Sequence, residues 1–120
     1  MKEYRLDFGR FIHHANGVLE AIIDEGYEIT ESMIREYFDL VKQIEPKVTA
    51  CLINRKNNYS YSFEANVMLS SADIVDYVAV INYGKLPWPM KGMLMPENYE
   101  LEFFNDYDAG MNWLEAKINN

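Results

Sequence analysis

Few residues in this sequence have side chains and a spacing that would suit catalysis. His13 and His14 are adjacent, and since consecutive strand side chains point to opposite faces, the two cannot chelate one metal ion together. Either imidazole could act as a base beside a carboxylate, because histidine titrates near neutral pH. No nucleophile, metal-ligand set or phosphate loop accompanies them. An enzyme is therefore the last function that we consider, and we expect no cofactor and no metal site.

A polar loop with the sequence NRKNNYSYS offers a candidate anion site. It follows a predicted central strand, and open α/β sheets usually bind ligands beyond the carboxyl ends of their strands. Basic side chains and the start of the next helix could hold a phosphate or a carboxylate. The candidate residues are Arg55, Lys56, Ser60 and Ser62. We favour the alternative of a solvated loop with a serine helix cap, because no glycine-rich turn lets backbone amides converge there.

The segment KLPWPMKGMLMP, residues 85–96, is the strongest functional lead. It holds three of the four prolines, three of the seven methionines and one of the two tryptophans. So short a piece cannot turn all its large side chains inward, and methionine-rich surfaces adapt readily to partners. The candidate residues for an interface or a small apolar ligand site are Trp88, Met90, Met93 and Met95. Simple cover of the sheet is an equally weighted alternative.

Composition restricts the partners and the compartment. The formal net charge of −8 would repel nucleic acid and anionic lipid surfaces, so we expect no nucleic-acid partner. The single cysteine, Cys51, lies in an apolar run and is predicted to be a core residue. A chain with one cysteine forms no internal disulfide, which is consistent with a reducing compartment. The first residues lack the apolar core of a signal peptide, and no apolar run is long enough to span a membrane. We therefore expect a cytoplasmic protein with one domain over residues 1–120.

Hydrophobic periodicity predicts the order of the elements. Residues 4–8 and 18–23 read as the strands of a hairpin with a tight turn at Asn16-Gly17 and a bulge at Gly9. The remaining strands are predicted at residues 48–54, 74–82 and 99–104, and they alternate with helices. Thr30 is predicted to cap the first helix, and Ser60 or Ser62 is predicted to cap the second helix. The last helix is predicted to begin near Asn105 or Asp106. The predicted fold is α/β, with a small mixed sheet that is mostly parallel after the opening antiparallel pair.

Three segments carry a resemblance to a known family. They are ANGVLEAIIDEGYEIT before a helix, VTACLINRKNNYSYSFEANVML as strand, loop and helix, and the closing LEFFNDYDAGMNWL. The closing segment resembles the end of SpoIIAA-like proteins of the STAS fold, in which a strand phenylalanine precedes acidic residues and a helix ending in Trp-Leu. The matching residues are Phe104, Asp106, Asp108, Trp113 and Leu114.

The resemblance implies a mixed sheet with helices mainly on one face, shared with anti-sigma antagonists and, more distantly, with CRAL-TRIO lipid-transfer domains. It does not imply one function. Family members that act as phosphorylation switches carry an Asp-Ser-Ser-Gly-type turn where this chain has NRKNNYSYS, so we transfer no phosphosite. We predict a non-enzymatic regulatory or protein-interaction module that forms a homodimer or binds another protein. The alternative is a binding protein for a small apolar or amphipathic ligand.

Overall fold

The computed structural model describes residues 1–83 and 95–119. In these two ranges the chain forms the following elements: β1 Lys2–Leu6, β2 Gly9–His13, β3 Val18–Ile23, β4 Glu28–Ile29, α1 Glu31–Gln43, β5 Ala50–Asn54, β6 Ser60–Tyr61, α2 Phe63–Ser71, β7 Tyr77–Ile81, β8 Glu100–Phe104 and α3 Tyr107–Ile118. The predicted alternation of helices and strands after an antiparallel start is confirmed.

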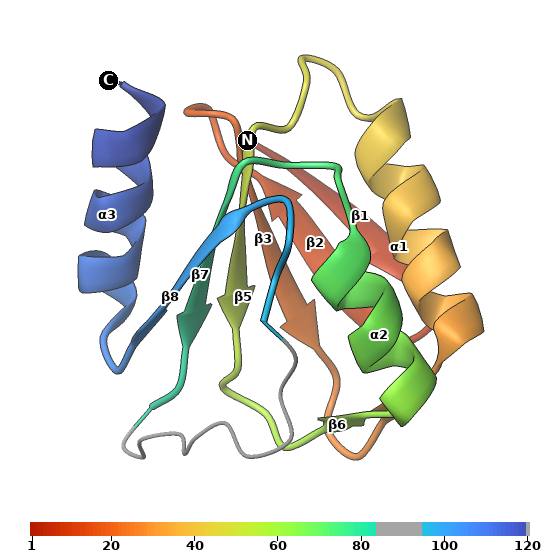
Figure 1. Ribbon diagram of the computed structural model, residues 1–120. Helices are drawn as coiled ribbons and strands as arrows, with labels where there is room; N and C mark the ends of the chain where they lie inside the picture. The colour runs from red at the N-terminus through yellow and green to blue at the C-terminus, as the bar shows by residue number, and fades with distance from the viewer. Residues whose placement is uncertain (84–94, 120) are drawn as a thin grey trace.

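Six strands form one mixed sheet in the order β1-β2-β3-β5-β7-β8 (Figure 1). The pairs β1·β2 and β2·β3 are antiparallel, whereas the pairs β3·β5, β5·β7 and β7·β8 are parallel. Strands β4 and β6 form a separate parallel pair of two residues each. The α/β class and the mixed sheet are therefore confirmed.

The N-terminal part differs from the predicted hairpin. It contains three strands, because a tight turn at Asp7-Phe8 separates β1 from β2 before the predicted turn at Asn16-Gly17 leads into β3. Gly9 is not a bulge but the first residue of β2, paired with Leu6 and Ile23. A Cβ atom at Gly9 would lie 2.6 Å from the carbonyl oxygen of Ile22, so close backbone approach explains the glycine.

Helices α1 and α2 cover one face of the sheet, and α3 covers the other (Figure 1). On the face of α1 and α2, Phe11, Leu19 and Ile34 belong to the larger apolar core. On the opposite face, Leu114 of α3 packs in a second core with residues of β3, β5 and β7, and its side chain is fully buried. The expectation of helices mainly on one face holds for α1 and α2 but not for α3.

Side-chain caps fix where the helices begin. Thr30 accepts a hydrogen bond from the amide of Met33, as predicted. Ser62, the second of the two predicted serines, caps α2, and Asp106 caps α3. These side chains accept amide protons that the first helical turn leaves without an intrahelical partner.

Gly110 brings α3 close to β7. A Cβ atom there would overlap the Cδ1 atom of Ile81, which is fully buried, and would lie 3.3 Å from Phe104. We expect Gly110→Ala to destabilise the protein by about 1–3 kcal/mol because overpacking outweighs the better helix propensity of alanine. Urea denaturation of Gly110→Ala, Ile81→Val and the double variant measures this. The double variant should lose less than the sum of the two single losses, and strict additivity would contradict the steric explanation.

Candidate functional site

A buried carboxylate marks the most distinctive polar site of the described structure. Glu20 lies in the middle of β3, every residue of which is buried, and only 4% of Glu20 is exposed. A charged side chain in such a position is costly unless hydrogen bonds satisfy it. Its surroundings therefore decide what it can do.

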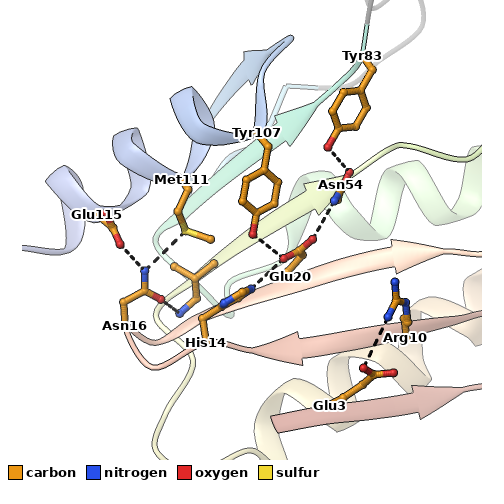
Figure 2. A network of polar contacts seen from close by, with 11 residues as sticks. Glu3, Arg10, His14, Asn16, Glu20, Asn54, Tyr83, Tyr107, Met111 and Glu115 are labelled. Carbon is orange, nitrogen blue, oxygen red and sulfur yellow. Dashed lines mark hydrogen bonds and ion pairs between the residues drawn. The ribbon is translucent and has the colours of Figure 1, made fainter. Parts of the chain in front are cut away.

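Three donors surround the Glu20 carboxylate (Figure 2). The hydroxyl of Tyr107 donates to Oε1 at 2.8 Å, and Nε2 of His14 lies 2.8 Å from the same oxygen. The side-chain amide of Asn54 donates to Oε2, also at 2.8 Å. The donors come from the start of α3, the residue just after β2 and the end of β5, so Glu20 joins three separate parts of the chain.

One further hydrogen bond extends the network at Asn54, and a second polar cluster lies beside it (Figure 2). The hydroxyl of Tyr83 donates to the side-chain oxygen of Asn54 at 2.8 Å. In the second cluster, the side chain of Asn16 accepts from the amide of Val18 at 3.1 Å and donates to Glu115 at 3.0 Å. Because Tyr107 lies in the first turn of α3 and Glu115 near its end, polar contacts attach this helix to the turn and strands beneath it at two points.

These hydrogen bonds determine the ionisation of the site. Burial alone would raise the pKa of Glu20, but hydrogen bonds from Asn54, His14 and Tyr107 outweigh it, and the pKa lies below the ordinary value of 4.5. Burial and the hydrogen bond to Glu20 raise the pKa of Tyr107 well above its ordinary value. At neutral pH, Glu20 is thus an anion held by a neutral tyrosine, an amide and an imidazole.

The arrangement could in principle orient a catalytic histidine, because a carboxylate that binds one imidazole nitrogen leaves the other free to act as a base. Such a base also needs a substrate beside it. Within residues 1–83 and 95–119, no cluster of three or more His, Cys, Asp or Glu side chains could hold a metal ion. The described contacts of the Glu20 carboxylate are with His14, Asn54 and Tyr107. They satisfy the buried charge, and the bond to Tyr107 attaches α3 to the sheet.

His13 lies on the other side of the sheet from the Glu20 network. It pairs in register with Leu19, a residue of the core beneath α1 and α2, and is 8% exposed. Its Nε2 atom has no hydrogen-bond partner in the described parts of the chain. Burial, and secondarily nearby positive charge, lowers its pKa. The side chains of the two adjacent histidines therefore lie on opposite faces of the sheet, as predicted.

The predicted anion loop is largely engaged with itself. The guanidinium of Arg55 donates to the carbonyl oxygen of Tyr59 at 2.9 Å and lies 4.3 Å from the centre of the Tyr59 ring. The hydroxyl of Ser62 accepts from the amide of Ala65 as the cap of α2. Ser60 pairs with Glu28 in the small second sheet, and Lys56 is exposed. The contact of Ser62 agrees with the helix cap in the favoured alternative of a solvated loop with a serine cap, whereas the guanidinium of Arg55 is bound within the loop.

Most of the predicted proline-methionine site lies outside the described residues. Trp88, Met90 and Met93 belong to residues 84–94. Met95 is described and is 80% exposed, so at least this side chain is not cover for the core.

A small cavity lies on the opposite side of the sheet from the Glu20 network. It has a volume of about 30 Å³, room for about one water molecule, and lies beneath α1 and α2. Its lining is almost entirely apolar and includes Phe11, Ile34 and Tyr37. A cavity of this size does not accommodate an amphipathic ligand.

The sequence reasoning missed the central residues of the polar network, namely Glu20, Asn54, Tyr83 and Tyr107. One signal was visible: Glu20 is the only charged residue in VLEAII, an otherwise apolar strand. A charge in a strand buried on both faces requires partners, and the polar residue that ends the neighbouring strand, Asn54, was a candidate. Nothing in the sequence pointed to Tyr83 or Tyr107.

No family model matches the chain, and neither a curated protein nor a solved structure matches it. The resemblance to SpoIIAA-like proteins therefore stays a prediction. No helix in the described ranges has both the length and the apolar character needed to cross a bilayer.

Proposed function

We propose that the protein is a non-enzymatic regulatory or interaction module of the SpoIIAA-like type that works by self-association. The observation that supports this proposal most directly is the outer edge of β1. This strand ends the six-stranded sheet, and no described strand pairs with its outer side. Unpaired strand edges are templates for another strand.

The strand register identifies which backbone groups of β1 are free. The amide of Asp24 donates to the carbonyl oxygen of Phe8, so the even-numbered residues of β2 direct their backbone groups toward β3. Since hydrogen-bonded pairs alternate along an antiparallel ladder, Tyr4 exchanges hydrogen bonds with Phe11. The backbone N–H and C=O groups of Glu3 and Arg5 consequently point away from the sheet, and both residues are exposed.

The Glu20 network supports the non-enzymatic part of the proposal. Its donors and acceptors bind one another, and the network joins α3 to the sheet. Since these polar groups bind one another, we propose that the protein recognises its partner through its surface. A ligand-binding role for the described apolar cavity is not proposed, because its volume of about 30 Å³ is too small.

Sedimentation velocity over a range of protein concentrations tests the proposal. We expect the wild type to show a monomer–dimer equilibrium. Glu3→Pro should remain monomeric, because proline lacks the outward N–H group yet costs no hydrogen bond to β2. Glu3→Ala keeps that group and is the matched control, so it should associate more strongly than Glu3→Pro. A wild type that stays monomeric at every concentration would overturn the proposal.

A further inference from the structure

We infer that β1 pairs antiparallel with β1 of a second copy, in a register centred on Tyr4. This inference rests on the proposed function, and it adds the geometry of the contact. The argument uses the direction of the backbone groups, the charges on the exposed face of β1 and the ion pairs that already surround them.

Backbone geometry limits the possible registers. Only Glu3 and Arg5 within the strand have outward N–H and C=O groups, and a two-fold antiparallel pair must place such residues opposite one another. The two-fold axis must then pass through a residue, at Glu3, Tyr4 or Arg5. An axis between two residues would oppose outward groups with inward ones and form no ladder.

Charge selects one of these three registers. An axis at Glu3 places two glutamates opposite each other, and an axis at Arg5 places two arginines opposite each other. The axis at Tyr4 instead places Glu3 opposite the partner's Arg5, and Arg5 opposite the partner's Glu3. Charged residues on an edge strand usually oppose pairing, so here they exclude the incorrect registers and favour one.

Ion pairs within the protomer extend this complementarity. The carboxylate oxygen Oε1 of Glu3 lies 3.7 Å from the guanidinium nitrogen Nη1 of Arg10. Arg5 forms an ion pair with Asp24 on the same sheet face. In the proposed dimer each Glu3 lies between its own Arg10 and the partner's Arg5. Each Arg5 lies between its own Asp24 and the partner's Glu3. Arg5 also lies directly opposite Arg10 in the β1·β2 ladder, so the partner's Glu3 would place a negative charge beside two like charges of one protomer.

The other face of β1 is apolar at the centre of the contact. Tyr4 packs at the margin of the core beneath α1 and α2, and only part of it is buried. Tyr4 and the partner's Tyr4 would form a non-hydrogen-bonded pair, the type whose side chains are closest. The opposite edge of the sheet offers no such charge match, because registers of β8 centred on Leu101 or Glu102 oppose glutamates and one centred on Phe103 pairs Glu102 with Phe104.

Disulfide crosslinking tests the register directly. In the proposed dimer, the Cα atoms at position 4 are about 4.5 Å apart, within the range of a disulfide. We expect Tyr4→Cys to form a covalent dimer under mild oxidation. Lys2→Cys and Leu6→Cys, each alone, should not, although Lys2 is more exposed than Tyr4. An equimolar mixture of these last two should crosslink, since Lys2 lies opposite the partner's Leu6.

Charge reversal provides a second test. Glu3→Arg and Arg5→Glu should each weaken self-association by about tenfold or more, because each places like charges opposite one another. Mixed together, the two variants should form a heterodimer, since both of its pairs then have opposite signs. Circular dichroism melting of each variant alone shows whether it remains folded.

The outcomes separate this inference from the proposed function. A dimeric wild type in which Lys2→Cys crosslinks as readily as Tyr4→Cys, or in which the mixed charge variants fail to associate, would overturn the register and leave the interaction module standing. A monomeric wild type would overturn both.

Discussion

Replacing Glu20 with alanine is expected to lower the free energy of unfolding by about 3–5 kcal/mol, because a buried donor left without its acceptor costs about 1–3 kcal/mol and several donors share this carboxylate. The substitution leaves the Tyr107 hydroxyl, the Asn54 amide and the His14 imidazole without their common acceptor. It also releases the first turn of α3 from the sheet. Urea denaturation followed by circular dichroism measures the loss.

Two further variants identify the cause. Glu102→Ala removes an exposed carboxylate from β8, and we expect it to change stability by no more than about 0.5 kcal/mol. Tyr107→Phe removes one donor to Glu20 and should cost about 1–2 kcal/mol. Equal losses for Glu20→Ala and Glu102→Ala would show that the buried network does not stabilise the fold.

The contribution of Glu20 should depend on pH. Its pKa in the folded protein lies below the ordinary value of 4.5, so the unfolded chain binds the proton more readily. The stabilisation that this carboxylate supplies is complete above its ordinary pKa and is lost as the pH falls through the folded value. The difference in stability between wild type and Glu20→Ala should therefore be greatest near neutrality and should shrink in acid.

Cys51 is expected to be almost unreactive toward thiol reagents in the folded protein. Burial raises the pKa of its thiol from 9.0 to about 11, only partly offset by a hydrogen bond with the Tyr37 hydroxyl. That shift alone lowers the thiolate fraction at pH 8 about 100-fold, and the buried position restricts access further. The reaction with a disulfide reagent should be fast in urea and slow without it.

The reactivity of Cys51 also bears on the crosslinking experiment. Wild-type protein without denaturant is the control for Tyr4→Cys, because its only thiol is the buried one. A fast native reaction at Cys51 would contradict the burial of this strand and would require Cys51→Ala in the crosslinking variants.

Much of the fold could be predicted from the sequence because local signals were strong. The buried runs of β5 and β7, the cap at Thr30 and the turn at Asn16-Gly17 are all encoded by adjacent residues. The turn at Asp7-Phe8 was missed because Phe8 continues the alternation of Tyr4 and Leu6, so a single longer strand fitted the pattern equally well.

The placement of α3 and the polar network were harder to predict. Helical periodicity shows that a helix has an apolar side but not which sheet face that side covers. The closest contact of Gly110 is with Ile81, and the hydroxyl of Tyr107 bonds Glu20; both contacts join distant parts of the chain. Long-range pairs of this kind leave no spacing pattern in one sequence.

The arrangement of the strands also has a consequence for how the chain acquires its structure. Strands β1, β2 and β3 are joined by short turns. The parallel strands β5, β7 and β8 are each separated from the preceding strand of the sheet by a longer segment of chain. Closing short loops costs less entropy, so we expect the N-terminal meander to be the folding nucleus, already able to form during synthesis. Its newly made outer edge would then be exposed on the ribosome before α3 exists, and neighbouring nascent chains on one messenger could meet there.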